Sequence, residues 1–518
     1  MIRDLRTCIQ ALEKEGLLLH VKAEVDRTWE LSAIMRWVYI GYPEEKRFAV
    51  MFDRVRGHDI PVVVGVLGAS YKTYAACLGI DPHGPRSQVM AKIRETWARA
   101  LDNPLNPILV KSGPCKENIL LGGKIDMHRF PIPVWTPEKD RGWEEGYGFI
   151  TAPCHVTKDP DTGMPNVGTY RASVRKEPNE LGLHWAPTSH MRMHFLRNEE
   201  RGKATEIATV TGADPVVGMT SVTRIPGGTN EYAIAGGLRG SPLEMVKCET
   251  VDLEVPAHAE IVIEGRMRPK SERAYEPEAP FGEYTGYQGS ASIAPVYEIS
   301  CISYRNGPIY QAFISQMAPS ESSKLRHIGH EALLLRELRA LGIQCVVDMN
   351  QPEGGQSGVV IASIRKRLDS DPARVASAVF AVARGAKFVI VTDDDVDIYD
   401  LDNVWWAITY RTSLAEGRRR VYFYDGFGQK GLDYSCYTSL EDALSKKEPV
   451  QSNMLIDATR PFAPYPVVSL PAVKYLEKAA ENWERTGLPP RERTELPRCI
   501  LMEEEYLQKG IVAKPKFI

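Results

Sequence analysis

The hydrophobic pattern in the last third of the chain changes repeatedly between strand and helix periods. Apolar runs at 345–348, 358–364 and 387–392 are short and rich in valine and isoleucine, as buried strands are. Helical patterns lie at 322–341 and 372–384. Strands that alternate with helices predict an α/β domain whose strands are largely parallel.

The rest of the chain has a different rhythm. Residues 4–17 and 87–100 have helical patterns, and 47–57 and 61–67 read as strands. From about 115 to 315, short strand-like runs stand between glycine and proline turns, at 147–156, 167–174, 206–210, 259–264 and 297–304. Their irregular spacing and long loops predict a sheet or barrel that carries a site on its connections.

A chain of 518 residues is too long for one hydrophobic core, so we expect several domains. The patterns predict an α/β multidomain protein with an N-terminal α/β domain over 1–114 and a central β-rich domain over 115–320. A C-terminal α/β domain follows over 321–470. Residues 471–518 form a helix and a tail that could contact a neighbouring subunit.

Composition narrows the choice of partners and compartment. The formal charge is −3 with no basic stripe, which argues against nucleic acid. No apolar run is long enough for a bilayer and the first residues lack a signal-peptide core, so we expect a cytoplasmic protein without a membrane partner. The nine cysteines form no C-x-x-C pair, so neither a disulfide framework nor a zinc knuckle is supported, and we expect most of them to be reduced core residues.

The most informative segment is the turn that carries Glu278 and Glu283. Pro280 and Gly282 prevent a regular helix between them, and a rigid turn can aim both acids at one point. Neighbouring carboxyl groups push each other's pKa apart, so that one can hold a proton that the other has lost. This arrangement can deliver a proton; the alternative is a surface loop with scattered acids.

Two further groups could carry chemistry. Asn166, His190 and Glu231 offer an amide oxygen, an imidazole and a carboxylate, which suit Mn²⁺ or Mg²⁺, although each could also be an ordinary surface or turn residue. Arg171 could bind a carboxylate or phosphate, pair with the acids of the turn, or face solvent. The acidic run 393–397 lacks EF-hand spacing and is better explained as the end of a buried strand.

Several runs occur in a characteristic order: NVGTYR at 166–171, a histidine at 190, GADPVVGMTS at 212–221, IPGGTNEYAIAGGLRGSPLEMVKC at 225–248, VPAHAEIVIEG at 255–265, EAPFGEYTGY at 278–287, VTDDDVDIYDLDNVWWAITYR at 391–411 and LIDATRPF at 455–462. Together they resemble the UbiD family of reversible, non-oxidative decarboxylases, which use prenylated FMN. The resemblance implies a central flavin-binding split β-barrel between two α/β domains. It also implies a homodimer or homohexamer that receives its cofactor from a flavin prenyltransferase.

The same resemblance assigns the site. A divalent metal, Mn²⁺ or Mg²⁺, bridges the cofactor phosphate with K⁺ nearby, and its ligands carry over to Asn166, His190 and Glu231, with His190 preferred over His184 and His194. The cofactor-binding residues it implies are Asn166, Val167, Gly168, Thr169, Arg171, Ser189, His190, Ser221 and Glu231. The catalytic network carries over to Arg171, Glu278 and Glu283.

The implied reaction releases CO₂ from an aromatic or heteroaromatic acid. Arg171 orients the substrate carboxylate, the cofactor takes up the electrons, and Glu283, tuned by Glu278, returns a proton. In the stretch 315–329, Lys324, His327 and Ile328 would face the substrate. The alternatives are a subunit of a phenolic-acid carboxylase or decarboxylase complex, and a non-catalytic flavin- or metal-binding subunit.

Overall fold

The computed structural model describes residues 2–139, 147–185, 189–225, 228–278, 280–289, 292–383, 385–425, 433–445, 451–491 and 495–514. The chain forms two compact units. The first holds the residues up to 84 together with 88–333, and the second holds 85–87 and 334–518. The expected segments 1–114 and 115–320 therefore lie in one unit, and the finer domain boundaries stay a prediction.

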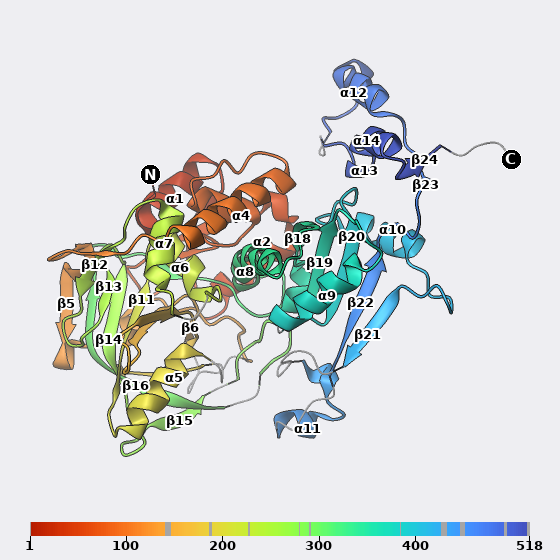
Figure 1. Ribbon diagram of the computed structural model, residues 1–518. Helices are drawn as coiled ribbons and strands as arrows, with labels where there is room; N and C mark the ends of the chain where they lie inside the picture. The colour runs from red at the N-terminus through yellow and green to blue at the C-terminus, as the bar shows by residue number, and fades with distance from the viewer. Residues whose placement is uncertain are drawn as a thin grey trace. The chain divides into compact units, whose positions relative to one another are not determined.

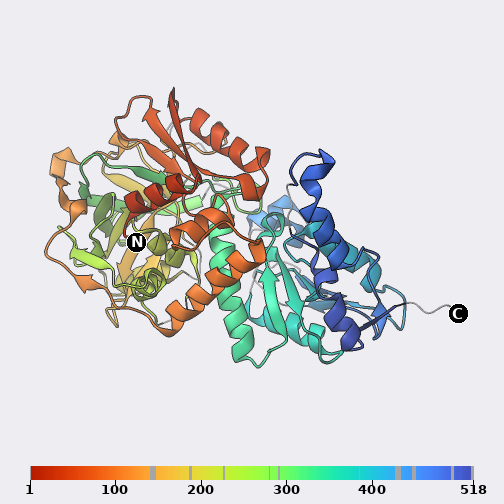
Figure 2. The ribbon, with the colours of Figure 1, turned by 90° about the horizontal axis from the view of Figure 1, so that it is seen from above.

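The first unit contains a small mixed sheet in the order β1-β2-β3-β17. Its strands are β1 (Leu18–Val25), β2 (Ala49–Val55), β3 (Val62–Val64) and β17 (Tyr310–Ala312). The helices near it in the chain are α1 (Leu5–Lys14), α2 (Glu30–Gly41), α3 (Tyr71–Cys77) and α4 (Arg86–Asp102). These N-terminal elements, red to orange in Figures 1 and 2, occupy one side of the first unit.

A ten-stranded sheet carries the rest of the first unit. Its main path is β6-β9-β10-β16-β14-β11-β7-β8, and β5 and β15 both pair with β16. The strands are β5 (Asn118–Leu121), β6 (Phe149–Ile150), β7 (Cys154–Lys158), β8 (Pro165–Gly168), β9 (Ala172–Val174), β10 (Glu180–Leu183), β11 (Thr205–Thr211), β14 (Ile261–Met267), β15 (Tyr275–Glu278) and β16 (Ser292–Tyr304). Neighbouring strands run antiparallel, which confirms the β-rich middle of the chain.

Three helices and a small sheet complete this unit. The helices are α5 (His190–Glu200), α6 (Pro215–Val222) and α7 (Glu231–Arg239), and the sheet has the order β13-β12-β4. Its strands are β4 (Ile108–Leu109), β12 (Glu244–Lys247) and β13 (Glu254–Pro256). One apolar core joins the four-stranded sheet β1-β2-β3-β17 to the ten-stranded sheet. It includes Phe52 and Val62 of the four-stranded sheet and Phe149, Leu181 and Tyr297 of the ten-stranded one.

The second unit is built on the sheet β18-β19-β20-β22-β21. Its elements are β18 (Val346–Asn350), β19 (Val359–Ile364), β20 (Phe388–Asp393), β21 (Val421–Asp425), β22 (Ser452–Ala458), α9 (Asp371–Val382) and α10 (Leu401–Arg411). The long helix α8 (Glu321–Ala340) begins in the first unit and ends in the second. Only the three central strands are mutually parallel, whereas β18 and β21 are antiparallel edges, so the expectation of largely parallel strands holds for the centre alone.

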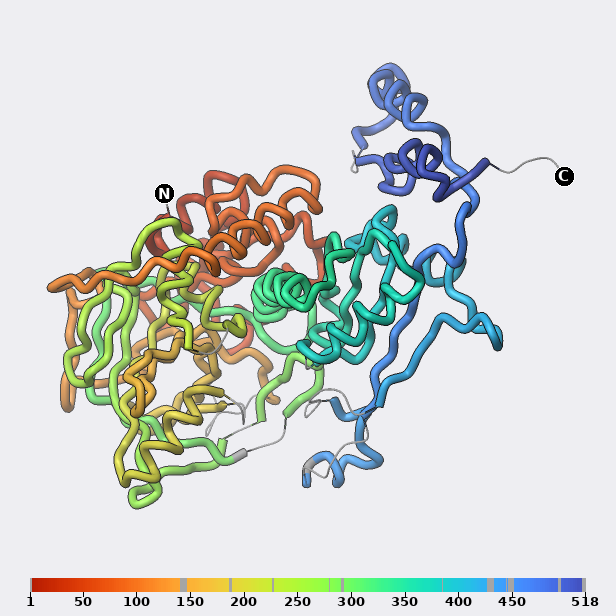
Figure 3. Tube along the Cα trace, viewed as in Figure 1, coloured from red at the N-terminus to blue at the C-terminus, as the bar shows by residue number. Residues whose placement is uncertain are grey.

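The acidic run after β20 forms an ion network. Arg411 donates from two nitrogens to the two carboxylate oxygens of Asp395, at 2.9 and 2.8 Å, and Asp393 accepts from the backbone N–H of Arg460 at 2.7 Å. The run therefore ends a buried strand, as expected. The remaining helices and strands of the second unit are α11 (Leu440–Leu444), β23 (Tyr465–Pro466), α12 (Val473–Glu481), α13 (Arg498–Leu501), α14 (Glu503–Gln508) and β24 (Val512–Ala513). The C-terminal helices are blue in Figure 3.

The structure also bears on the cysteines and on the possibility of a membrane-spanning helix. Cys8 of α1 and Cys77 of α3 pair as a disulfide with their Cα atoms 5.7 Å apart, whereas the other seven cysteines are free, in line with the expectation that most are reduced. The two residues lie 69 positions apart, and only the packing of the two helices brings them together. Among the described helices, none is both long and apolar enough to span a bilayer.

Candidate active site

Arg171 is the centre of a buried charge network on the ten-stranded sheet. It lies between β8 and β9, and its Nε and Nη2 donate to the two carboxylate oxygens of Glu278 at 3.2 and 3.1 Å. Its Nη1 donates to Glu283 at 2.7 Å. The structure therefore brings together the three residues that the sequence assigned to catalysis.

The turn after β15 holds its two acids in place. The backbone N–H of Glu283 donates to the carbonyl of Tyr287 at 2.9 Å, and that of Gly289 donates to Phe281 at 2.8 Å. A Cβ at Gly282 would lie 2.6 Å from Cγ of Gln316, so a larger residue there would have to displace the Gln316 side chain. The turn is thus internally bonded, and Glu283 is fixed on it.

The electrostatics of the network favour a charged Glu278. Burial alone would raise the pKa of this carboxyl, but the contact with His184 and the charge and hydrogen bonds of Arg171 outweigh it and lower the pKa to about 2. His184 Nδ1 lies 3.3 Å from a Glu278 oxygen. Sequence reasoning considered His184 only as a possible metal ligand, and its place beside Glu278 depends on the pairing of β9 and β10.

The proposed metal ligands also come together. Ser189 caps α5 and Asn230 caps α7, so His190 and Glu231 are the first residues of their helices. His190 Nδ1 lies 3.2 Å from Asn166 Oδ1, and Glu231 accepts from the backbone N–H of Val167 at 3.3 Å. These contacts place all three side chains around the strand β8.

The chemistry of this group suits a cation. Asn166 is 6% exposed, and its Nδ2 has no hydrogen-bond partner within the part of the chain that the structure describes. Burial raises the pKa of Glu231 to about 7, although backbone hydrogen bonds from Glu231 and Val167 partly oppose this shift. Among the described residues, no three His, Cys, Asp or Glu side chains gather as a metal site, and Asn166 would have to contribute an amide oxygen as a third ligand. An imidazole, a carboxylate and an amide oxygen together fit a hard divalent ion.

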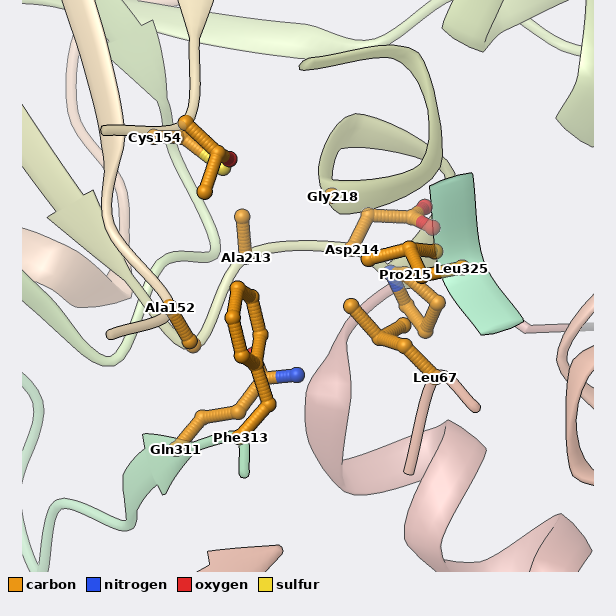
Figure 4. Close-up of a pocket in the computed structure, with 12 residues that line it drawn as sticks. Leu67, Ala152, Cys154, Ala213, Asp214, Pro215, Gly218, Gln311, Phe313 and Leu325 are labelled. Atoms are coloured by element: carbon orange, nitrogen blue, oxygen red, sulfur yellow. The ribbon is translucent and has the colours of Figure 1, made fainter. Parts of the chain in front are cut away.

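A pocket opens next to the other expected cofactor residues. Thr169 Oγ1 lies 2.7 Å from Ser221 Oγ, and the backbone N–H of Thr169 donates to the Ser221 carbonyl at 3.1 Å. The pocket is lined by Leu67, Ala152, Cys154, Thr169, Gly212, Ala213, Asp214, Pro215, Gly218, Gln311, Phe313 and Leu325 (Figure 4). It lies wholly in the first unit and mixes apolar walls with a buried carboxyl at Asp214.

The residues expected to face the substrate lie in the first turns of α8. Lys324, His327 and Ile328 are all buried, so they do not face solvent. Lys324 forms an ion pair of 2.8 Å with Glu44, and both side chains are almost fully enclosed. A further cation, Arg326, lies with its guanidinium carbon 5.0 Å from the ring centre of Tyr284. Sequence reasoning passed over Arg326, although it stands in the same stretch.

Comparison with known proteins agrees with this geometry. Residues 9–93, 108–318 and 324–458 match the N-terminal, Rift-related and C-terminal domains of 3-octaprenyl-4-hydroxybenzoate carboxy-lyase, UbiD. An uncharacterized protein of Archaeoglobus fulgidus is 34% identical over 450 residues, which cover 84% of this chain and 89% of that protein. The chain belongs to the UbiD family and is a carboxy-lyase.

Solved structures have the same fold. The UbiD-class enzyme HmfF from Pelotomaculum thermopropionicum, in complex with FMN, has a TM-score of 0.79 and 31% identity, covering 92% of this chain and 99% of its own. An evolved dimeric form of HmfF in complex with prenylated FMN gives 0.76 and 30%, covering 92% and 98%. The vanillic acid decarboxylase of Sedimentibacter hydroxybenzoicus gives 0.78 and 26%, covering 94% and 99%.

Proposed function

We propose that this chain is a reversible decarboxylase of an aromatic or heteroaromatic carboxylic acid that works with prenylated FMN. The observation that carries the proposal is the network in which Arg171 holds Glu278 and Glu283 at one point. The likeness to HmfF and to vanillic acid decarboxylase supports it.

Arg171 orients the substrate. A guanidinium has five N–H donors, and three of its nitrogens each donate once to the two glutamates. Two N–H groups are left for the carboxylate that departs as CO₂, and a fixed arginine holds such a group well. The fork to Glu278 keeps the guanidinium from turning, so that these free donors point in one direction.

Glu283 moves the proton. Its side chain is 17% exposed, whereas that of Glu278 is fully enclosed, so Glu283 is the acid that a substrate can reach. After CO₂ leaves, Glu283 donates a proton to the carbon that carried the carboxylate. Glu278 stays charged and balances the charge of Arg171. A reaction in the opposite direction uses the same groups in reverse.

The residues around β8 would hold a divalent metal and the flavin cofactor. Asn166, His190 and Glu231 would hold Mn²⁺ or Mg²⁺, with K⁺ nearby. Val167, Gly168, Thr169, Ser189 and Ser221 would line the cofactor. When bound, prenylated FMN supplies an electrophile that accepts the electrons left by CO₂. A flavin prenyltransferase would supply this cofactor, and the enzyme would act as a homodimer or homohexamer.

The test begins with the cofactor. The chain is coexpressed with a flavin prenyltransferase and manganese, and the bound flavin is identified by absorption spectrum and mass. CO₂ release is then measured with a panel of aromatic acids. Near-stoichiometric prenylated FMN together with CO₂ release supports the proposal. An empty protein, or one with ordinary FMN that releases no CO₂ after reconstitution, contradicts it.

The first turns of α8 are proposed to determine which acid the enzyme accepts. Lys324, His327 and Ile328 are proposed to border the substrate, and polar groups there favour a phenolic or nitrogen-containing ring. The likeness to a vanillic acid decarboxylase favours the phenolic acid, and a subunit of a larger complex is the second candidate. Copurification of a partner protein with the tagged chain from its native host would favour that candidate.

A further inference from the structure

Arg36 of α2 binds the backbone of the loop 315–319, which lies against the turn that carries Glu283. Its Nη1 donates to the carbonyl oxygens of Met317 at 2.7 Å and of Pro319 at 2.9 Å. Its Nη2 donates to the carbonyl oxygen of Ser315 at 3.3 Å. Arg36 forms no ion pair with any other residue that the structure describes. Its guanidinium therefore binds main-chain carbonyls instead of an acid.

The helix α2 gives Arg36 a fixed base. Leu31, Met35 and Tyr39 on the same helix are fully buried in the core that it shares with the four-stranded sheet. The hydroxyl of Tyr39 also donates to the carbonyl of Gly68 at 3.3 Å. The helix and the loop 315–319 both belong to the first unit. The position of the guanidinium is thus set by a packed core outside the site.

The loop 315–319 has a backbone conformation that needs support. Gln316 has a φ of 79°, in the left-handed region that residues other than glycine seldom adopt. Such a conformation persists only when the surrounding contacts hold it. The Gln316 side chain donates from Nε2 to Thr136 Oγ1 at 2.5 Å. Arg36 binds the carbonyls of the residues directly before and after Gln316, so it holds the backbone at the unusual position.

The loop packs on the turn on both sides of Glu283. A Cβ at Gly282 would lie 2.6 Å from Cγ of Gln316, and a Cβ at Gly286 would lie 3.3 Å from Cγ of Met317. Gly282 precedes Glu283 in the chain and Gly286 follows it. A shift of the loop would therefore change the position of the acid that moves the proton.

We propose that Arg36 is a positioning residue for proton transfer: it holds the loop 315–319, and this loop keeps Glu283 in its place beside Arg171. The inference rests on the proposed decarboxylase function and adds to it a residue that acts from outside the site. Glu278, which precedes the turn, holds Arg171 through its own two hydrogen bonds. Binding of the substrate carboxylate should therefore depend on Arg36 less than proton transfer does.

The first measurement separates turnover from substrate binding. CO₂ release by the loaded enzyme is followed over a range of concentrations of the aromatic acid that it accepts. Arg36→Gln removes the guanidinium, and we expect kcat to fall about tenfold to a hundredfold while KM changes by less than about threefold. Arg36→Lys keeps the charge and can still donate to carbonyls, so its kcat should lie between. Arg99→Gln removes an exposed arginine from α4 and, as the matched control, should change neither constant.

The second measurement needs neither cofactor nor substrate. The backbone N–H groups of Glu283, Gly286 and Gly289 are hydrogen-bonded within the turn. Hydrogen–deuterium exchange, followed by mass spectrometry, therefore reports how firmly the segment 281–289 is held. Arg36→Gln should speed exchange in this segment by about tenfold and leave exchange in β14 unchanged. Arg99→Gln should exchange as the wild type does.

An unchanged kcat or an unchanged exchange of the segment 281–289 in Arg36→Gln overturns the inference. Faster exchange throughout the first unit also overturns it, because the loss would then be one of stability and not of position. If Arg36→Gln does not fold, Arg36→Lys is measured in its place. If the wild type decarboxylates no aromatic acid but exchange of the turn depends on Arg36, the proposed function fails and the positioning of the turn stands. If CO₂ is released and Arg36→Gln equals the wild type in both measurements, the inference fails and the proposed function stands.

Discussion

Arg171 and Glu278 share two parallel hydrogen bonds, of 3.2 and 3.1 Å; the Glu278 side chain is fully enclosed and that of Arg171 is 9% exposed. This fork fixes both the position and the rotation of the guanidinium. Because β15 pairs with β16 while Arg171 stands between β8 and β9, the fork joins segments 107 residues apart. The network is therefore a product of the whole ten-stranded sheet and not of one motif.

The first prediction concerns Glu283 as the proton donor. Glu283→Gln keeps the shape of the side chain, but the amide of glutamine is not acidic and cannot donate a proton to the substrate carbon. We expect CO₂ release by the loaded enzyme to fall by about 10²–10⁴-fold. The free energy of unfolding should change little, since this side chain is partly exposed. Glu276→Gln is the matched control on β15, because Glu276 pairs with Arg273 and not with the network. Wild-type turnover in Glu283→Gln would contradict the assignment.

The second prediction is a pH dependence of stability that arises from Glu278. Its folded pKa of about 2 lies below the ordinary value of 4.5, so the charged form stabilises the fold. That contribution is complete above the ordinary value and is lost as the pH falls through the folded pKa. The shift corresponds to about 3 kcal/mol. Denaturant unfolding of wild type and Glu278→Gln should show a difference at about pH 6 that shrinks by this order near pH 2.

A constant difference between the two proteins across that range would show that Glu278 has an ordinary pKa in the fold. Glu276→Gln again serves as the control. The pKa of Glu276 is also lowered, chiefly by its hydrogen bond with Arg273, but the Glu276 side chain is far less enclosed than that of Glu278. Its replacement should therefore change the pH profile only slightly.

Period and turn chemistry in the sequence predicted the elements with the longest and most regular patterns. The buried run at 387–392 became β20 and the long helical pattern at 322–341 became α8, because both patterns are local and strong. The edges of the second sheet were predicted less well, since strand direction depends on how distant segments pair. The side-chain pattern of a strand is the same whether it runs parallel or antiparallel to its neighbour. The antiparallel direction of β18 and β21 follows only from their pairing with β19 and β22.

The site was predictable where a residue type implies its chemistry. Glu278 and Glu283 were found from the turn between them, whereas Arg171 could be assigned to them only through the family resemblance. His184 and Arg326 were missed in those roles for the same reason. Each owes its surroundings to a partner about 40 residues or more away, Glu278 in one case and Tyr284 in the other. Periodicity cannot report such a contact.

The third prediction distinguishes the three histidines near the metal group. Only His190 approaches Asn166, at 3.2 Å; His184 lies beside Glu278, and His194 is bonded to Thr157 at 2.9 Å. Mn²⁺ should raise the melting temperature of the wild-type apoprotein, since a ligand that binds only the folded state stabilises it. His190→Gln should lose this shift.

His194→Asn is the matched control, because an asparagine oxygen or nitrogen can replace Nδ1 as the partner of Thr157. It should keep the manganese shift, as should His184→Gln. Retention of the shift by His190→Gln together with its loss in His194→Asn would move the imidazole ligand to His194. Calorimetric titration with Mn²⁺ alone gives the affinities directly.

The fourth prediction concerns the buried pair of Lys324 and Glu44. Removing one partner of an enclosed ion pair leaves the other charge without compensation, so Lys324→Met should reduce the free energy of unfolding by about 3–5 kcal/mol. Glu44 also accepts the backbone N–H of Tyr71 at 3.1 Å, and a glutamine there keeps that bond. Adding Glu44→Gln to Lys324→Met should therefore recover most of the loss.

Lys270→Met provides the exposed counterpart. Lys270 pairs with Glu199 at 3.1 Å but its side chain is 67% exposed, so its replacement should change the free energy of unfolding much less than Lys324→Met does. The double variant of Lys324→Met and Glu44→Gln then distinguishes a structural role of Lys324 from a role in substrate recognition. If Lys324 borders the substrate, the variant folds normally but changes its preference among aromatic acids in the CO₂ assay. An unchanged preference would leave Lys324 with a purely structural role, because its ammonium group is already neutralised by Glu44.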